Sequence, residues 1–397
     1  MTTQEIINLE ESFQLRTYRK WPLALVRGEG SYVWDADGTR YLDFYGGHCV
    51  SLLGHCPPGV VAAVQEQAEA LLFYSNVAYS PVRAKAATLL ADMAPEGLGH
   101  VFFCNSGTEA NETALKLARK HTGKPGILAM EQGFHGRTLG SLATTWNATY
   151  RAPYRTVLPD THFVPFGSLE AVEAVLDAND DLAAVILEPI QSMAGIVEAP
   201  DAYFADLRAL CDHHDVLLLF DEVQTGVGRT GTFSISEQFD ITPDLITLAK
   251  SLGSGVPVGA VLVSEAIAPE VEHGDQGSTF GGGMLAMAAV TATLETLLTE
   301  RLMDRAWAIH QGIREAVTPL VKDVRGRGCL IGLELDSPAV PVLARLRALG
   351  VLAGGSGHPN VIRLMPPLTA SDDDVATFAE AFSLALETTS DPCLQTA

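Results

Sequence analysis

Basic residues are few in this chain of 397 residues, in which 26 Lys and Arg stand against 48 Asp and Glu. The formal net charge is −22, and no block of like charges is present. This balance argues against nucleic-acid binding and predicts good solubility. Lysine is especially scarce, with seven copies. An anionic ligand must therefore be bound by local donors, because the field of the whole protein repels it.

The chain also lacks the patterns of metal sites, membrane spans and secretion. None of its six cysteines forms a C-x-x-C pair, so we expect no metal site and free thiols in a reducing compartment. His48, His55 and Cys56 lie close in sequence but are more typical of a turn. No apolar run approaches the ~20 residues that span a bilayer, and the N-terminus lacks an apolar signal segment. We therefore expect a cytoplasmic protein with no membrane partner.

Two short apolar runs each end in a charged residue. Residues 216–220 read as a parallel strand that is buried on both faces, and Asp221 follows them. Residues 245–249 read the same way and are followed by Lys250. Ligands of open α/β sheets lie beyond the carboxyl ends of the strands, so an acid and an amine are predicted at the mouth of one sheet.

Lys250 differs from the other six lysines because its neighbours are apolar residues and glycines. Burial lowers the pKa of a lysine, and a neutral amine can attack a carbonyl to form a Schiff base. The alternative is a lysine whose stem packs at a strand end while its head stays in water. Asp221 could pair with the ring nitrogen of a pyridinium cofactor, or could cap a turn. Either residue alone is weak evidence, whereas the pair favours the cofactor.

A phosphate site is expected where residues 101–104, a short apolar strand, lead into a helix. Ser106 and Glu109 have the spacing of a capping box, and the helix should run to about residue 121. Gly107 and Thr108 at its N-terminus would let backbone N–H groups, a hydroxyl and the helix dipole face an anion. An ordinary helix cap is the alternative.

At this point the chain resembles the class III aminotransferases. The matching segments are NSGTEANE, FHGRT, EPIQ, FDEVQTGVGRTG, LAKSLGSGVPVG, GSTFGG and VRGRG, in the family's order from about residue 27 to 367. Within the family, the chain is most similar to the acetylornithine aminotransferases, including a branch in which the acyl group is succinyl. The resemblance implies the type I fold of pyridoxal 5'-phosphate enzymes, with a mainly parallel sheet flanked by helices and a smaller α+β domain.

The resemblance also implies an activity and a place for it. The enzyme would move the δ-amino group of N-acetylornithine or N-succinylornithine to 2-oxoglutarate, in arginine biosynthesis, as a homodimer with shared active sites. Lys250 would hold the cofactor and Asp221 would face its ring nitrogen. The other implied cofactor contacts are Ser106, Gly107, Thr108, Phe134, Glu188, Gln224 and, from the other subunit, Thr279. The implied substrate contacts are Arg137, Ser278 and Arg363.

Two segments depart from the family pattern. Many relatives have a glutamate two residues after EPIQ, which pairs with the arginine matching Arg363, whereas this chain has Ser192 and Met193. That charge switch is absent, so Arg363 stays available for a carboxylate in both half-reactions. The usual GGNPLA is replaced at residues 281–286 by GGGMLA, which should alter a helix start near the dimer interface.

The order of elements predicts the architecture. Residues 31–44 read as a hairpin, and strands are expected at 101–105, 126–130, 183–188, 216–221, 244–249 and 259–263, alternating with helices. We predict an N-terminal segment (1–45) packed on the small domain, a large cofactor domain (46–283), and a linking helix with the C-terminal small domain (284–397). A G-x-G-x-x-G match at 226–231 lacks the strand–helix context of a dinucleotide site.

Rival functions use the same residues. Ornithine, 4-aminobutyrate or carrier-bound lysine could be the amino donor. A decarboxylase, racemase or aminomutase would share the scaffold without depending on 2-oxoglutarate. A cofactor-binding protein without turnover is disfavoured by the Lys250–Asp221 pair.

Overall fold

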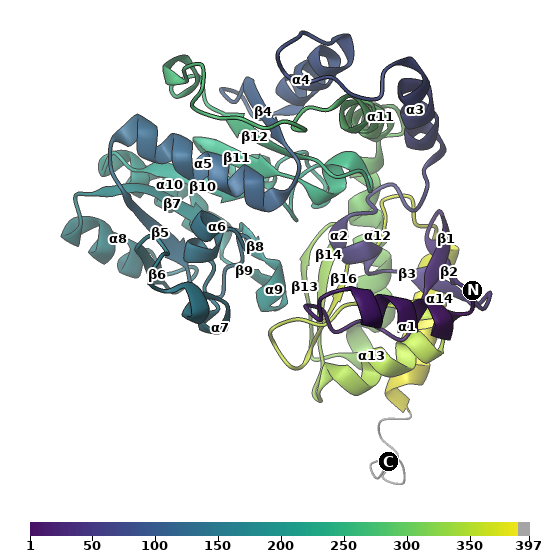
Figure 1. Ribbon diagram of the computed structural model, residues 1–397. Coiled ribbons are helices and arrows are strands. Elements are labelled where there is room, and N and C mark those ends of the chain that lie inside the picture. The colour runs from purple at the N-terminus through teal and green to yellow at the C-terminus, as the bar shows by residue number, and fades with distance from the viewer. Residues whose placement is uncertain (388–397) are drawn as a thin grey trace.

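The computed structural model describes residues 1–387, and its largest element is a seven-stranded sheet (Figure 1). The strand order is β4-β12-β11-β10-β7-β5-β6. Their bounds are β4 (His100–Cys104), β12 (Gly259–Val263), β11 (Leu245–Leu248), β10 (Leu217–Asp221), β7 (Leu182–Leu187), β5 (Gly126–Met130) and β6 (Thr161–Val164). The mainly parallel sheet and the six strands expected from the apolar runs are confirmed, with ends shifted by at most a residue or two.

The sheet is not wholly parallel, since β12 runs antiparallel to both β11 and β4. Residues 249–258, which connect β11 to β12, hold only a short 3₁₀ helix, Lys250–Gly253. A parallel crossover needs a dozen or more residues, so this connection returns the chain antiparallel. Strand β6 was not predicted, because its four residues are mostly half-exposed and include a threonine and a histidine. Every residue of β7, by contrast, is buried.

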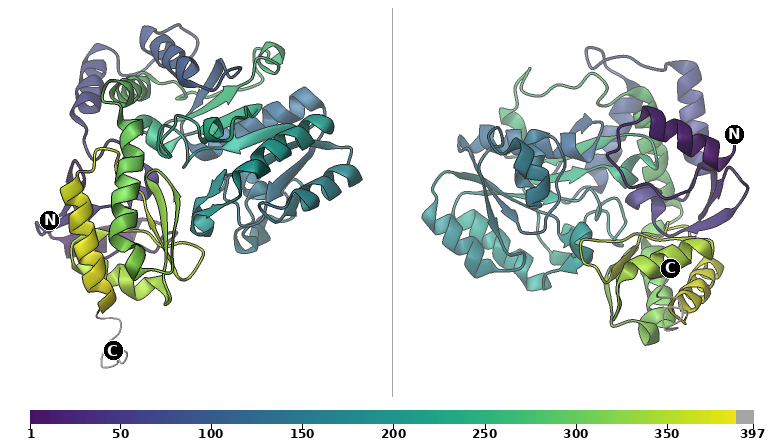
Figure 2. Two further views of the ribbon diagram at one scale, coloured as in Figure 1. Left: turned by 180° about the vertical axis from the view of Figure 1, so that it is seen from behind. Right: turned by 60° about the horizontal axis from the view of Figure 1, so that its bottom comes forward.

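Helices cover both faces of this sheet (Figure 2). On one face, α5 (Gly107–Thr122) packs on β12, β11 and β7. On the other face, α8 (Leu169–Ala178) contacts β6 and α10 (Asp201–His213) contacts β10. The predicted capping box of α5 is incomplete. Ser106 caps the Glu109 amide, but the Glu109 carboxylate accepts from the Asn105 amide, one residue earlier than expected. The carboxylate therefore also fixes the loop that leads into the helix.

A second region joins both ends of the chain. The predicted 31–44 hairpin is present, and its strands share a sheet with a strand from the C-terminal part, in the order β1-β2-β3-β15. Residues 324–336 and 360–368 supply three strands of another sheet, as expected. The bounds are β1 (Leu25–Glu29), β2 (Tyr32–Asp35), β3 (Arg40–Asp43), β15 (Val351–Leu352), β13 (Asp323–Arg327), β14 (Leu330–Glu334) and β16 (Val361–Leu364). The largely exposed β1 was not predicted.

The remaining helices pack around these sheets. The long helix expected from residue 284 is α11, which begins at Met284 without a side-chain cap and contacts α3 and α4. Its neighbours in the chain are α12 and, further on, α13 and α14. The bounds are α1 (Thr3–Phe13), α2 (Gly46–Cys49), α3 (Pro58–Ala70), α4 (Pro81–Met93), α6 (Leu139–Thr144), α7 (Ala148–Arg151), α9 (Ser192–Gly195), α11 (Met284–Thr299), α12 (Leu302–Val317), α13 (Ala339–Ala348) and α14 (Asp372–Glu387). A two-stranded ribbon, β8 (Ile190–Gln191) and β9 (Val197–Glu198), flanks α9.

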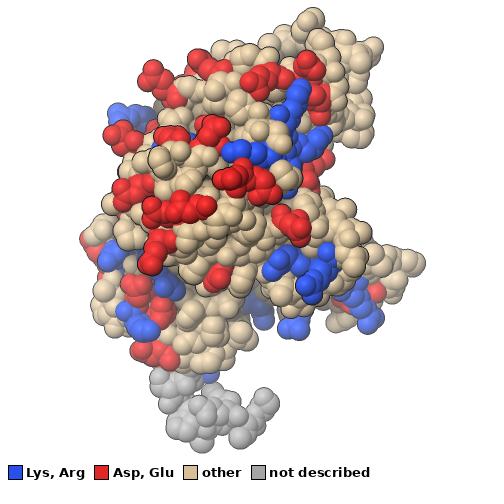
Figure 3. All heavy atoms as spheres, turned by 90° about the vertical axis from the view of Figure 1, so that its left-hand side faces the viewer, with Lys and Arg blue, Asp and Glu red and all other residues tan. Residues whose placement is uncertain are grey.

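The surface is acidic, as the net charge predicts, and the described cysteines are free thiols, as their spacing predicts. Acidic side chains are spread over the face seen in Figure 3, with fewer basic side chains between them. The five cysteines within residues 1–387 are free, and Cys393 lies outside the described residues. Among the helices of this part of the chain, none is both long and apolar enough to cross a membrane. The G-x-G-x-x-G match forms a turn, in which Gly228 and Gly231 have positive φ and lie against Met303 and Trp307.

Candidate active site

A cavity of about 460 Å³ lies where β10 and β11 end and α5 begins. Nine of the twelve site residues predicted from the sequence line it: Ser106, Gly107, Thr108, Phe134, Arg137, Glu188, Asp221, Gln224 and Lys250. Three do not: Ser278, Thr279 and Arg363. Its volume is within the range of small-molecule sites.

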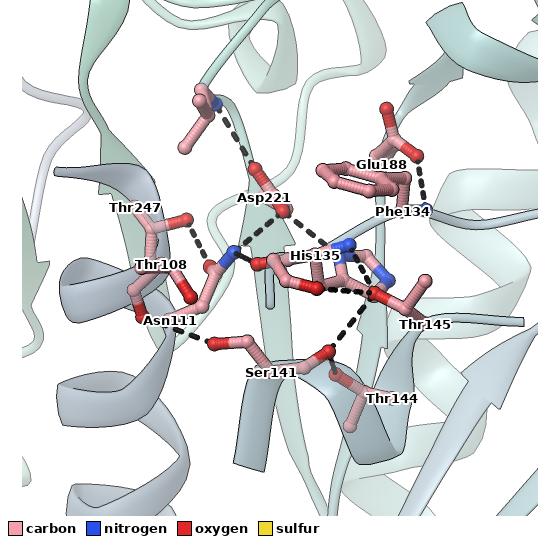
Figure 4. Close-up of polar contacts among 12 residues, drawn as sticks. Thr108, Asn111, Phe134, His135, Ser141, Thr144, Thr145, Glu188, Asp221 and Thr247 are labelled. Atoms are coloured by element: carbon pink, nitrogen blue, oxygen red, sulfur yellow. Dashed lines mark hydrogen bonds and ion pairs between the residues drawn. The ribbon is translucent and has the colours of Figure 1, made fainter. Parts of the chain in front are cut away.

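Asp221 is 4% exposed and its carboxylate is held by two buried side chains (Figure 4). The amide nitrogen of Asn111 and Nδ1 of His135 each lie 2.8 Å from Oδ2 of Asp221. The Val223 amide donates to Oδ1 at 3.1 Å. These contacts give the carboxylate one orientation in the wall of the cavity.

Asn111 and His135 were not assigned roles from the sequence. Asn111 is 1% exposed, donates also to the carbonyl of His135 at 2.7 Å, and accepts from the Thr247 hydroxyl at 2.7 Å. It lies four residues after Gly107, on the same face of α5, and that spacing was the one available signal.

Lys250 lines the same cavity from the residue that follows the β11 run. Burial lowers the pKa of its amine, an effect that the charges of Asp221 and Glu188 partly oppose and that Arg363 reinforces. The amine can therefore lose its proton more easily than an exposed lysine. Its φ of +39° is unusual for a residue with a Cβ, and such strain is concentrated at functional sites.

Glu188 follows β7 and faces the acid and the amine. Burial, together with the charge of Asp221, raises the pKa of Glu188 to about 7. Its Oε1 accepts from the Phe134 amide at 2.8 Å, so it ties the end of β7 to the loop that carries Phe134, His135 and Arg137 (Figure 4). This carboxyl group can hold a proton near neutral pH.

The start of α5 presents donors to the cavity. Gly107 is required because a Cβ there would lie 2.9 Å from both Cγ atoms of Val223, which also lines the cavity. The Thr108 hydroxyl lies 2.8 Å from that of Thr138 and accepts from the Arg137 amide at 3.3 Å. Free N–H groups at the N-terminus of a 16-residue helix suit an anion such as phosphate.

A second, larger cavity of about 1050 Å³ adjoins the first and shares Phe134 and Arg137 with it. The guanidinium carbon of Arg137 lies 3.4 Å from the ring centre of Tyr150. Burial, with the charges of Arg363 and Lys250, lowers the pKa of His48 to about 3, so this lining histidine is neutral. Arg137 is the one charged side chain among the described residues that line the second cavity.

The three predicted residues outside the first cavity have different surroundings. The hydroxyl oxygen of Ser278 accepts from Nδ2 of Asn105 at 3.2 Å, and Asn105 lines the cavity. Thr279 is exposed. Arg363 is 1% exposed and donates to Oγ of Ser192 at 3.0 Å and to the Gly355 carbonyl at 2.7 Å. The chain thus buries Arg363 behind the site and leaves Thr279 on the surface.

Within residues 1–387, no group of three or more His, Cys, Asp or Glu is arranged to hold a metal ion. An amine with a lowered pKa, a fixed carboxylate and an anion-binding helix end meet in one cavity. That donor set can bind an anionic ring cofactor through its anion, its ring nitrogen and a carbonyl carbon.

Known proteins resemble the chain along nearly its whole length. The family model described as Aminotransferase class-III matches residues 13–386. An acetylornithine aminotransferase from Methanopyrus kandleri is 46% identical over 379 residues, which cover 94% of this chain and 96% of that protein. An ornithine aminotransferase structure from Toxoplasma gondii matches with a TM-score of 0.92 at 29% identity, covering 98% of this chain and 94% of that one. An acetylornithine aminotransferase structure from Elizabethkingia anophelis matches with a TM-score of 0.85 at 30% identity, covering 98% and 100%.

Proposed function

The chain belongs to the class III aminotransferases, and from that premise we propose that its amino donor is an N-acylornithine. It is a pyridoxal 5'-phosphate-dependent enzyme with the type I fold. The proposed reaction moves the δ-amino group of N-acetylornithine, or N-succinylornithine, to 2-oxoglutarate. The products are the N-acylglutamate semialdehyde and glutamate, as in arginine biosynthesis. The observation that carries the proposal is the meeting of Lys250 and Asp221 in one cavity.

The residues present fit the cofactor. The Gly107–Thr108 helix end offers N–H groups to its phosphate, and the approach needs a glycine because Val223 leaves no room for a Cβ. Asp221 offers a carboxylate that the side chains of Asn111 and His135 already orient. Phe134 offers an aromatic face from the loop bound to Glu188. When bound, the cofactor would supply an electron-accepting ring that stabilises negative charge at the donor's δ-carbon.

The roles of the chain's own residues follow from their charges. Asp221 keeps negative charge opposite the ring nitrogen and so holds that nitrogen protonated. Nζ of Lys250, with its lowered pKa, accepts the proton that leaves the δ-carbon. Gln224 would bond the ring hydroxyl, and Glu188 would support the floor of the site, where its raised pKa lets it hold a proton near neutral pH. Ser106, Gly107 and Thr108 hold the phosphate.

Substrate carboxylates are assigned to the two arginines. Arg137 binds the α-carboxylate of the acylornithine, and Arg363 binds the α-carboxylate of 2-oxoglutarate or glutamate. Ser278 contacts the substrate from its place beside Asn105. The second cavity supports acetyl over succinyl, because a second carboxylate would find no further cation among its described lining residues.

A homodimer with shared active sites completes the proposal. Thr279 is exposed on its own chain, where it can reach the phosphate of a partner subunit. Beside it the exposed Phe280 packs against Phe73 with the two rings tilted and their centres 5.1 Å apart. Large apolar side chains are also exposed nearby in sequence to Phe73: Leu71, Leu72, Tyr74, Val77 and Tyr79. So much exposed apolar surface is typical of a covered interface.

The proposal also includes the division into domains and the cellular location. The proposed packing of residues 1–45 on the small domain is supported by the pairing of β3 with β15, which joins the N-terminal segment to the C-terminal part. A cytoplasmic location fits the free thiols of the described residues.

Ornithine is the second candidate donor, favoured by the structural likeness to the Toxoplasma gondii enzyme. A steady-state panel tests the choice: purified, cofactor-loaded protein receives 2-oxoglutarate with N-acetylornithine, N-succinylornithine, ornithine or 4-aminobutyrate, and glutamate is measured. We expect the largest kcat/KM for N-acetylornithine. A larger value for ornithine or 4-aminobutyrate would reject the proposed donor. Repeated turnover of the donor in the absence of 2-oxoglutarate, with no glutamate formed, would indicate a decarboxylase, racemase or aminomutase.

A further inference from the structure

The guanidinium of Arg363 is buried among uncharged acceptors. Oγ of Ser192 and the Gly355 carbonyl accept from it at 3.0 and 2.7 Å, and the Tyr45 hydroxyl is a further partner. Arg363 is 1% exposed, and Ser192 is fully buried. A buried cation with neutral partners keeps most of its charge free for an incoming anion.

Ser192 joins this arginine to the first cavity. Its hydroxyl donates to Oε1 of Gln224 at 3.0 Å, and Gln224 lines the cavity together with Lys250. Gln224 is 6% exposed, so its amide has little freedom to exchange this partner for water. One hydroxyl thus bridges β16, which carries Arg363, and the loop after β10, which carries Gln224.

The direction of the hydrogen bonds in this bridge follows from the amide orientation in the structure, which places Oε1 of Gln224 against the Ser192 hydroxyl. A guanidinium only donates, so Ser192 accepts from Arg363 and donates its single proton to Gln224. Because Oε1 of Gln224 faces Ser192, the NH₂ group of the same amide points away from Ser192. Gln224 is therefore set to donate toward the cavity.

We propose that Ser192 is the positioning residue that couples the carboxylate-binding arginine to the amide orientation of Gln224. Through one hydroxyl it holds Arg363 in place for a substrate carboxylate and presents the Gln224 NH₂ group to the ring hydroxyl. This inference rests on the proposed function, in which Arg363 and Gln224 have those ligands.

The test uses the cofactor-loaded enzyme and two readouts other than turnover. The first is the dissociation constant of glutarate, a five-carbon dicarboxylate that lacks the reacting carbonyl. The second is the wavelength of the cofactor's absorbance maximum. In Ser192→Ala we expect glutarate to bind about tenfold more weakly, the effect of losing one hydrogen bond to a charged group, and the absorbance maximum to shift. Ser192→Cys keeps the side-chain size with a weak donor, and should change both readouts in the same direction.

Two further variants separate the possible failures. Ser264→Ala removes a serine hydroxyl that has no hydrogen-bond partner among the described residues, and should change neither readout. Arg363→Lys should weaken glutarate binding by removing the planar fork. If Arg363→Lys weakens binding while either readout stays at the wild-type value in Ser192→Ala, the inference about Ser192 is overturned and the proposed function stands. If glutarate binds Arg363→Lys normally, the acceptor role proposed for Arg363 fails, and the inference fails with it.

Discussion

Asp221 and Glu222 are neighbours in the chain and both are buried, with exposures of 4% and 1%, yet their surroundings differ. Asp221 lines the cavity with Lys250 and is held by an amide and an imidazole. Glu222 does not line it, and its acceptors are filled by the Ser234 and Thr225 hydroxyls and the Ile235 amide. Burial raises the pKa of Glu222 to about 7.

The difference teaches that burial does not by itself mark a catalytic acid. The Glu222 carboxyl meets its hydrogen-bond needs inside the turn that follows β10, and can hold a proton near neutral pH. Asp221 has its outer face directed at a cavity that also holds an amine. Whether a buried carboxyl group can act in the reaction depends on the hydrogen-bond donors around it and on the open space in front of it. Four experiments test whether Asp221 and Glu222 differ in this way.

The largest effect is expected for Lys250→Ala, which removes the amine that faces Asp221. Turnover should fall by at least about 10⁴-fold, because both the covalent attachment of the cofactor and the proton transfer are lost. The measurement is kcat at saturating N-acetylornithine and 2-oxoglutarate. Lys322→Ala is the matched control, since Lys322 is exposed and pairs with Glu334. Near-wild-type transamination by Lys250→Ala would show that the Lys250 amine is not needed for the reaction.

Asp221→Asn and Glu222→Gln form the direct comparison. Asn keeps the shape of Asp221 but removes the charge that the ring nitrogen needs, so kcat should fall by about 10²- to 10³-fold. Glu222→Gln should leave kcat within about threefold, because its contacts lie inside the turn. Both are measured in the same steady-state assay. Equal losses in the two variants would show that buried charge as such matters, and the comparison would be wrong.

Asn111→Ala tests whether the donors around Asp221 matter. The change removes one of the two side-chain donors to the carboxylate and leaves the Thr247 hydroxyl without its acceptor. We expect about a tenfold fall in kcat/KM, the effect of losing one hydrogen bond to a charged group. Asn179→Ala, at the end of α8, is the control. Wild-type kinetics in Asn111→Ala would mean that Asp221 is oriented without it.

Glu222→Gln should have the smallest effect on activity but should change how the free energy of unfolding depends on pH. Its folded pKa is raised from 4.5 to about 7, so its contribution to stability is complete below pH 4.5 and is lost as the pH rises through 7. Glu222→Gln removes this loss. Between about pH 5 and pH 8 the variant should lose less unfolding free energy than the wild type, by up to about 3 kcal/mol. Urea unfolding at several pH values measures this, and parallel pH profiles would contradict it.

The acid and the amine could be predicted because each follows a local apolar run, and a strand end is a local signal. Strands β1 and β6 were not predicted because most of their residues are exposed or half-exposed, and the direction of β12 depended on the length of one connection. These are features that apolar patterning does not record.

The support around Asp221 could not be predicted in the same way. Asn111 and His135 reach it across 110 and 86 residues, and no local pattern reports such contacts. The bridge from Arg363 through Ser192 spans 171 residues, and it came from the fold alone. The sequence showed that Ser192 and Met193 depart from the family pattern. It did not show that the Ser192 hydroxyl contacts Arg363 and Gln224.

We propose that Lys250 and Asp221 form the reacting centre of an aminotransferase that takes an N-acylornithine. A single-turnover absorbance experiment tests it most directly: cofactor-loaded protein is mixed with N-acetylornithine alone, and 2-oxoglutarate is added afterwards. The account predicts that the visible band of the lysine-bound cofactor disappears rapidly with N-acetylornithine and returns with 2-oxoglutarate. A band that is absent from the start, or that only unacylated donors remove, would contradict the account.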